Sequence, residues 1–210
     1  MPLVIPRLYA IIDPAQAAGR SSREVAEALV LAGVRLIQLR DKRASSRELW
    51  ASGCELGSQV HQSQGIFIVN DRADIAAAVE ADGVHVGQED LPVEFARRLL
   101  PAGKWVGYST HVLEQVKEAD RSSADYIAFG PVFPTASKEN PDPVVGLEGL
   151  RGARQATRKP LVAIGGITLE NTRAAIEAGA DSVAVIRGLI AAPDVRQRAE
   201  EFLEVLGIRD

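Results

Sequence analysis

The chain has 210 residues, 46% of them hydrophobic, and carries 24 Lys and Arg against 28 Asp and Glu, a formal net charge of −4. This balance excludes a general electrostatic attraction to nucleic acid or to an anionic membrane, so any anion must be bound locally. The lone Cys54 excludes a disulfide framework, and with no apolar run near about 20 residues and no secretion signal we expect a cytoplasmic protein.

Short apolar runs alternate with helical patterns from the first residues onward. Leu8 to Ile12 predicts a strand, and a serine cap near Ser21 followed by Glu24 predicts the start of a helix. A second strand is predicted from Val34 to Arg40, and a helix capped by Ser45 or Ser46 follows it to about residue 62, which places Cys54 in a helix as a buried thiol. The later strands are expected over 66–69, 83–86, 105–108, 124–129, 161–164 and 182–185, and the later helices over 74–81, 92–100, 111–121, 147–157, 169–178 and 194–205.

Eight strand and helix units in this order predict parallel pairing, because each crossover between parallel strands must carry a connecting segment such as a helix. The strands are apolar throughout, as expected for a sheet that helices cover. We therefore expect an α/β fold, a (β/α)8 TIM barrel with a closed parallel sheet, forming one domain over residues 1–210. An open doubly wound sheet is the alternative, although no Gly-x-Gly-x-x-Gly follows the first strand.

Polar residues gather after the predicted strands, where a barrel of this kind holds its active site. They include Gln38 to Lys42, Asn70-Asp71, Gly87 to Asp90 and Ser109 to His111. Gln38 and Arg40 are one pleat apart, so both are expected to point into the barrel and to contact a ligand. The alternative is that Arg40 and Lys42 are charges on the rim.

The loop after the sixth strand, residues 131–145, carries Thr135, Ser137 and Lys138 behind two prolines. Two hydroxyls and an ammonium suit a phosphate, whereas the alternative is a surface loop with a solvated lysine. Gly165-Gly166 precede a helix capped by Thr168, and Arg187-Gly188 follow the last strand. Exposed backbone N–H groups at the start of the Thr168-capped helix predict a phosphate cradle, and Arg187-Gly188 lie where many barrels hold a phosphate.

Two aspartates at neighbouring strand ends, Asp71 and Asp90, suit Mg²⁺, which takes one or two carboxylates and fills its shell from water and phosphates. Their alternative role is helix capping. His85 lies within a strand and is interpreted as structural, while His111 at a predicted helix start could cap, contact a phosphate or donate a proton. Cations, hydroxyls and a carboxylate pair together favour chemistry in which pyrophosphate leaves.

Ordered sequence blocks cover nearly the whole chain and resemble those of the thiamine phosphate synthase family. The blocks are Gln-Leu-Arg-Asp-Lys at 38–42, Asn70-Asp71, Val-His-Val-Gly-Gln-Glu-Asp at 84–90, Gly-Tyr-Ser-Thr-His at 107–111, Gly-Pro-Val-Phe-Pro-Thr-Ala-Ser-Lys at 130–138 and Ile-Gly-Gly-Ile at 164–167. The resemblance implies a transferase that couples 4-amino-5-hydroxymethyl-2-methylpyrimidine diphosphate to a thiazole phosphate. Its products are thiamine monophosphate and pyrophosphate, formed by dissociative loss of the Mg²⁺-bound leaving group.

The resemblance also implies the site residues. The pyrimidine diphosphate would be held by Gln38, Arg40, Lys42, Asn70, Ser109 and Lys138, with Asp71 and Asp90 on Mg²⁺, and the thiazole phosphate by Thr135, Ser137, Gly166, Ile186 and Arg187. Within the same motifs, Leu39, Asp41 and Ala136 are included as substrate-binding residues. Catalytic roles are expected for Arg40, Lys42, Ser109 and Lys138.

This chain departs from the family pattern at three positions. Ser137 replaces a usual threonine and keeps the hydroxyl, and Asp41 replaces a common glutamate. Arg187 stands where the family usually has serine, so its guanidinium could add a bidentate phosphate contact or turn outward.

Three alternative functions use the same barrel: a thiazole tautomerase relying on His111, a non-catalytic sensor of thiamine precursors, and a Schiff-base aldolase relying on Lys42 or Lys138. The metal aspartates and the Thr-x-Ser-Lys loop favour the synthase over the tautomerase, and a sensor needs no magnesium pair facing a leaving group. The aldolase is disfavoured because no acid and base pair for carbon chemistry stands out. The expected partners are small-molecule substrates, with no nucleic acid and no membrane, and a homo-oligomer is left open.

Overall fold

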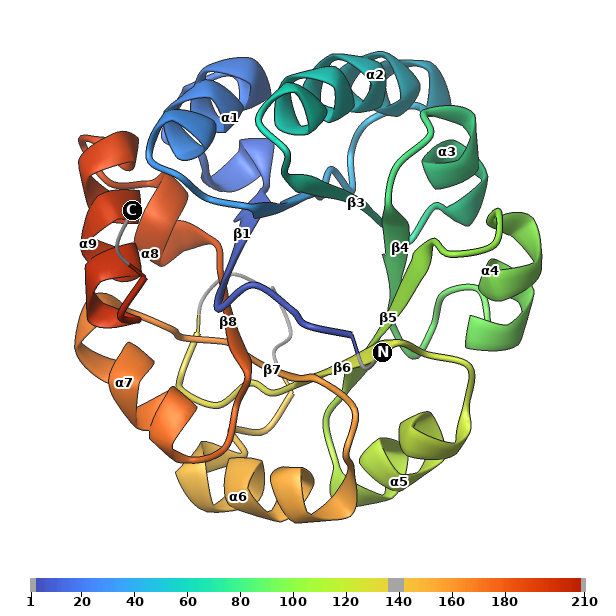
Figure 1. Cartoon of the computed structure of the whole chain (residues 1–210), viewed down its shortest axis with the longest axis vertical. Coiled ribbons are helices and arrows are strands. Elements are labelled where there is room, and N and C mark those ends of the chain that lie inside the picture. Colours follow the sequence, from blue (N-terminus) through green and yellow to red (C-terminus); the bar gives the residue numbers. More distant parts are fainter. Residues whose placement is uncertain (1–2, 136–141, 209–210) are drawn as a thin grey trace.

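A closed barrel of eight parallel strands forms the centre of the molecule in the computed structural model, which describes residues 3–135 and 142–208. Each strand pairs with its neighbours in sequence order, and β1 closes the ring on β8, with Leu8 opposite Val183. Helices surround the ring on the outside, as Figure 1 shows. The predicted TIM barrel is therefore confirmed, and the doubly wound alternative is wrong.

The strands and helices fall close to the predicted ranges. The strands are β1 (Leu8–Ile12), β2 (Leu36–Leu39), β3 (Ile66–Asn70), β4 (Gly83–Val86), β5 (Trp105–Thr110), β6 (Tyr126–Phe129), β7 (Leu161–Ile164) and β8 (Ser182–Val185). The helices are η1 (Pro14–Gln16), α1 (Ser22–Leu31), α2 (Ser46–Gln62), α3 (Ala73–Ala78), α4 (Val93–Leu99), α5 (Leu113–Arg121), α6 (Gly146–Ala156), α7 (Leu169–Glu177), α8 (Arg187–Ile190) and α9 (Val195–Val205).

Helix starts follow the sequence signals where the caps are strong. Ser21 caps α1 and Ser45 caps α2, and each serine is joined by a glutamate three residues later in a reciprocal capping box. The α5 helix begins later than predicted, at Leu113, because β5 continues to Thr110. His111 therefore lies in the connecting turn, and the prediction that it begins the helix is wrong.

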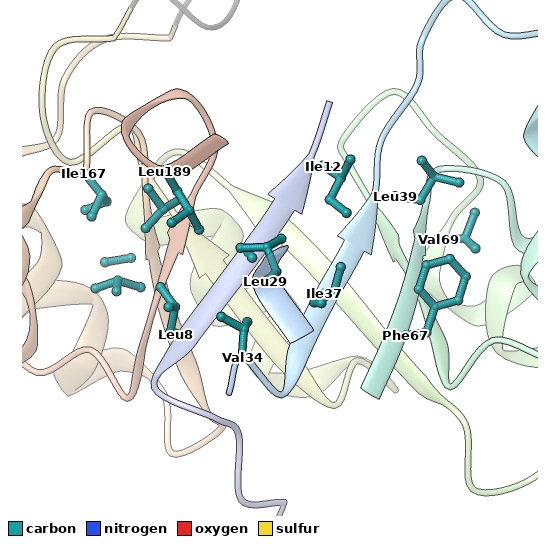
Figure 2. Packing of buried hydrophobic residues seen from close by; sticks show 14 of the residues in the cluster. Leu8, Ile12, Leu29, Val34, Ile37, Leu39, Phe67, Val69, Ile167 and Leu189 are labelled. Carbon is teal, nitrogen blue, oxygen red and sulfur yellow. The ribbon is translucent and has the colours of Figure 1, made fainter. Parts of the chain in front are cut away.

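Side chains of the strands alternate between two apolar layers. One layer lies between sheet and helices; Figure 2 shows part of it, with Leu39 beside Ile12 and Val69. The second layer fills the barrel interior with residues such as Tyr9, Tyr126 and others at every second strand position. The interior also holds polar side chains, among them Gln38 and His85, both almost fully buried.

Aspartates at the amino ends of three strands tie neighbouring strands together. Asp82 accepts a hydrogen bond from the backbone N–H of Phe67 at 2.8 Å, and Asp181 accepts one from Leu161 at 2.8 Å. Asp125 does the same for Val106 at 2.7 Å. Each carboxylate also has a cationic or histidine partner from a nearby helix or loop. This recurring contact joins β3 to β4, β5 to β6 and β7 to β8 at their amino ends.

Cys54 lies on the exposed side of α2, so its predicted burial is wrong. The α2 helix buries a different stripe of residues against the barrel. Among the described helices, none combines the length and the apolar character that crossing a membrane requires.

Candidate active site

A cavity of about 1380 Å³ opens at the carboxyl ends of the strands. Its walls come from all eight strands, β1 to β8, and from the loops that follow most of them. Of the predicted site residues, those that line this cavity are Gln38, Arg40, Lys42, Asn70, Asp71, Asp90, Ser109, Thr135, Gly166, Ile186 and Arg187. Residues 38 and 187 are far apart in sequence, and closure of the barrel brings them to one hollow.

Two predicted residues do not line the cavity. Leu39 is buried in the layer between sheet and helices, where Figure 2 shows it near Ile12 and Val69. Asp41 accepts hydrogen bonds from the backbone N–H groups of Arg43 and Ala44, at 2.9 and 3.1 Å, and thereby shapes the turn after β2. The predicted contacts of Ala136, Ser137 and Lys138 lie outside the described residues.

The two cations after β2 each have an aspartate partner. Arg40 forms an ion pair with the buried Asp13, which also caps η1 by accepting a hydrogen bond from Ala15 N. Lys42 Nζ lies 2.6 Å from Asp71 Oδ2. Asp13 thus fixes the guanidinium at the barrel mouth, whereas Lys42 stays half exposed beside a carboxylate.

Asp71 and Asp90 form a carboxylate pair. Asp71 adopts a left-handed backbone conformation with φ 59°, and its N–H donates to the carbonyl of His85 at 2.7 Å. Asp90 Oδ2 accepts a hydrogen bond from Gly87 N at 2.7 Å. Neither aspartate caps a helix, because the cap residues of α3 and α4 are Arg72 and Pro92, so the capping alternative is wrong.

Burial and a hydrogen bond with Asp90 raise the pKa of Asp71 to about 6, while the ammonium of Lys42 opposes this rise. Two adjacent carboxylates resist ionising together, so a cation between them would relieve their repulsion. The pair fits Mg²⁺, which takes one or two protein carboxylates and completes its shell with water and phosphate oxygens. Within the described ranges no group of three or more His, Cys, Asp and Glu side chains is arranged around a metal position.

The loop after β7 brings backbone close to the cavity. Gly165 and Gly166 both have positive φ, and a Cβ on Gly166 would lie 2.4 Å from the carbonyl oxygen of Pro134. Thr168 stands at the N-cap of α7, and its N–H donates to Asn171 Oδ1 at 2.8 Å. This glycine loop and helix start provide the geometry in which backbone N–H groups bind an anion.

Two arginines face the cavity on the same side. Arg187 follows β8, and within the described chain its guanidinium makes no hydrogen bond or ion pair. Arg198 reaches the cavity from α9 and lies 3.1 Å from Glu201. Sequence analysis missed Arg198, because nothing in the local sequence of α9 indicates that this helix packs beside the barrel mouth.

The floor of the cavity carries a chain of hydrogen-bonded side chains that sequence analysis also missed. It links Gln38, Tyr9, Tyr126, His85 and Ser109. Sequence analysis treats Tyr9 and Tyr126 only as apolar residues of two predicted strands. Alternation along each strand could have indicated that both tyrosines point into the barrel.

His111 lines the cavity near the loop after β6. Its Nδ1 donates to the carbonyl of Gly130 at 2.6 Å and lies 3.5 Å from Asp142 Oδ2. The histidine therefore contacts both ends of that loop.

Comparisons with known proteins identify one family to which the chain is similar over most of its length. The family model described as "Thiamine monophosphate synthase" matches residues 8–189. The chain is 50% identical over 208 residues to a thiamine-phosphate synthase from Koribacter versatilis, covering 97% of each protein. It is 42% identical over 202 residues to one from Chloroflexus aurantiacus, covering 96% of this chain and 93% of that protein.

Among solved structures, a thiamine phosphate pyrophosphorylase from Pyrococcus furiosus superposes with a TM-score of 0.87 and 37% identity. The match covers 96% of this chain and 95% of that one. An orotidine 5'-phosphate decarboxylase from Pyrococcus horikoshii superposes with a TM-score of 0.66 at 15% identity, a likeness that extends to the fold alone.

Proposed function

Because the chain belongs to the thiamine monophosphate synthase family, we propose that the cavity at the carboxyl ends of the strands holds the two substrates of that reaction against opposite walls. The enzyme couples a pyrimidine diphosphate to a thiazole phosphate and releases pyrophosphate with thiamine monophosphate. The observation that supports our assignment of the walls is the distribution of charge in the cavity. Cations and a carboxylate pair follow β2 to β4, while the glycine loop and two arginines follow β7 and β8.

The wall made by β2 to β5 binds the pyrimidine diphosphate in our proposal. Arg40 and Lys42 meet the diphosphate, and Asn70 and Ser109 supply further hydrogen bonds beside them. Lys138, which the structure does not describe, is proposed to complete this group. Asp71 and Asp90 hold Mg²⁺, which when bound supplies positive charge to the diphosphate oxygens.

The reaction begins when the bond between the pyrimidine CH₂ carbon and the diphosphate oxygen breaks, and its electron pair stays on the oxygen. Arg40 and Lys42 stabilise that growing negative charge, an effect that in a site shielded from water contributes several kcal/mol to the rate. The aminopyrimidine ring stabilises the carbocation. The thiazole nitrogen then donates its lone pair to the carbocation and forms the new C–N bond, so the residues' main task is to align the two rings.

The opposite wall binds the thiazole phosphate. The backbone of Gly166 and the start of α7 meet the phosphate oxygens, and Arg187 adds a guanidinium that has no partner in the described structure. Thr135 and Ile186 are proposed to contact the same substrate, while Arg198 adds charge from α9. Ser137, which lies outside the described residues, is proposed to contact it as well. A serine at position 187, which is usual in the family, would offer the phosphate one neutral hydroxyl, whereas the arginine offers a charged group with several N–H donors.

The tautomerase alternative is not supported, because the relatives at 40% to 50% identity carry the synthase name. We further propose that the protein is cytoplasmic and can assemble into a homo-oligomer.

The function is tested with purified protein, both substrates and Mg²⁺, measuring pyrophosphate and thiamine monophosphate together. We expect equal amounts of the two products, and we expect chelation of the metal to stop both. Production of pyrophosphate without thiamine monophosphate would show hydrolysis in place of coupling and would contradict the proposal.

The diphosphate wall is tested by Lys42→Ala, with Arg43→Ala as the matched control. Arg43 is the next residue, exposed and outside the cavity. Removing one charge from the leaving group should lower kcat by about 100-fold for Lys42→Ala, a loss in the range of one electrostatic contact at a transition state. Equal rates for the two variants would remove Lys42 from the mechanism.

A further inference from the structure

Five side chains form an unbroken line of hydrogen bonds across the inside of the barrel. Gln38 Nε2 donates to Tyr9 Oη at 2.5 Å, and the hydroxyls of Tyr9 and Tyr126 lie 2.9 Å apart. His85 Nδ1 lies 3.1 Å from the Tyr126 hydroxyl, and His85 Nε2 lies 2.8 Å from Ser109 Oγ. We call this line the relay; its two ends, Gln38 and Ser109, are both cavity residues.

The first donor and the burial of the tyrosines together determine the direction of the later hydrogen bonds. An amide nitrogen only donates, so Tyr9 accepts from Gln38. The Tyr9 hydroxyl is buried and, among the described residues, Tyr126 is its other hydrogen-bond partner, so Tyr9 donates to Tyr126. Tyr126 in turn donates to His85 Nδ1. An imidazole that accepts at Nδ1 carries its proton on Nε2, and this proton is donated to Ser109 Oγ.

This direction decides what the two ends of the relay offer to a ligand. Ser109 Oγ accepts a hydrogen bond from His85 Nε2, so the Ser109 hydroxyl can donate its own hydrogen bond into the cavity. The amide oxygen of Gln38 makes no hydrogen bond within the described chain and remains an acceptor. One end therefore presents an acceptor and the other end a donor, on walls formed by β2 and β5.

The barrel is built around the centre of the relay. Tyr9 and Tyr126 are at most 1% exposed. Gly107 leaves the room they need, because a Cβ at that position would lie 2.1 Å from Tyr126 Cζ and 2.4 Å from His85 Nδ1. Burial raises the pKa of both tyrosines above their ordinary value, so both keep the protons that the relay requires.

We propose that Tyr9, Tyr126 and His85 are positioning residues, which transmit the orientation of the Gln38 amide across the barrel and hold the Ser109 hydroxyl as a donor to the pyrimidine diphosphate. The part that concerns the substrate rests on the proposed function. The direction of the relay rests on the side chains alone and can be measured without a substrate.

The first test is nitrogen NMR on the full chain labelled with ¹⁵N-histidine, without substrates. The chain has three histidines, so a His85→Gln spectrum identifies the His85 signals. We expect His85 to carry its proton on Nε2, with Nδ1 as a hydrogen-bonded acceptor. Tyr126→Phe should shift the Nδ1 signal toward that of a nitrogen without a donor, whereas Tyr108→Phe, a control on the outer face of β5, should not.

A proton on Nδ1 of His85 in the unsubstituted protein would overturn the proposal, and so would an Nδ1 signal that Tyr126→Phe leaves unchanged. If Tyr126→Phe does not fold, the unsubstituted protein still decides the proposal, because its spectrum alone shows whether Nδ1 or Nε2 of His85 carries the proton. This experiment needs no turnover. If the protein lacked synthase activity, the proposed function would be contradicted, but the NMR spectrum would still show the direction of the relay.

The second test compares kcat for Tyr126→Phe, Ser109→Ala and the double variant. If Tyr126 acts through Ser109, Tyr126→Phe should lower kcat about five-fold in the unsubstituted protein and less than about two-fold in the Ser109→Ala background. A purely structural role for Tyr126 gives the same loss in both backgrounds. Losses that multiply in this way would overturn the positioning role.

Discussion

At the scale of single residues, Asp71 is the clearest case of a side chain whose chemistry is set by its surroundings. Its pKa is raised from 3.8 to about 6 by burial and by Asp90. The folded protein therefore holds this proton more tightly than the unfolded chain. This group stabilises the metal-free protein below about pH 4, and the contribution is lost as the pH rises through about 6.

We expect Asp71→Asn to remove this pH dependence. Asparagine tolerates the left-handed backbone at this position, where φ is 59°. In metal-free buffer at pH 7 the variant should be more stable than the unsubstituted protein by about 1 kcal/mol, after allowance for solvent screening, and the two should converge near pH 4. Urea unfolding across this range measures the difference, and parallel curves would show that Asp71 does not titrate as described.

Arg187 offers a second test at this scale, because its guanidinium faces the cavity without a partner among the described residues. Arg187→Ser should raise KM for the thiazole phosphate about ten-fold and leave kcat within about two-fold, since the arginine binds the phosphate equally before and during reaction. Steady-state kinetics with the exposed Arg173→Ala as control measures this. A change in kcat alone would place Arg187 in the chemical step.

At the scale of elements, the aspartates before β4, β6 and β8 each accept a hydrogen bond from a backbone N–H of the preceding strand. Asp181 accepts the Leu161 N–H at 2.8 Å and pairs with Arg154 at 2.8 Å. Asp181→Ala should lower the free energy of unfolding by about 1 to 2 kcal/mol, because a backbone donor at the start of β7 loses its partner. Urea unfolding should show this loss, whereas the exposed Glu177→Ala should change stability by less than about 0.5 kcal/mol.

At the scale of the whole molecule, one closed sheet links every strand to two neighbours. We therefore propose that residues 1–210 unfold as a single domain in one cooperative transition. Mg²⁺ and pyrophosphate together should raise the thermal midpoint by about 5 to 10 °C at 100 times their Kd, a gain of about 2.7 kcal/mol. Pyrophosphate giving the same increase in the presence of a chelator would contradict the role of Asp71 and Asp90 as metal ligands.

Much of the fold followed from local patterns. Apolar runs such as Leu8–Ile12, and serine caps such as Ser21 and Ser45, act over a few residues and were predicted close to their observed positions. The short α8 helix was missed, because four residues are too few to show helical periodicity. Cys54 was placed in the correct helix but on the wrong face, since one cysteine does not reveal which stripe of that helix is buried.

The sequence alone determined the order of the strand and helix units and the gathering of polar residues after the strands, because both depend on neighbours along the chain. Only the tertiary structure decided that Asp71 and Asp90 form a pair instead of capping helices, and that Leu39 and Asp41 lie outside the cavity. It also joined Tyr9 to Tyr126, 117 residues away. Such contacts exist only when the sheet closes, since closure is what turns every second strand residue toward the same interior.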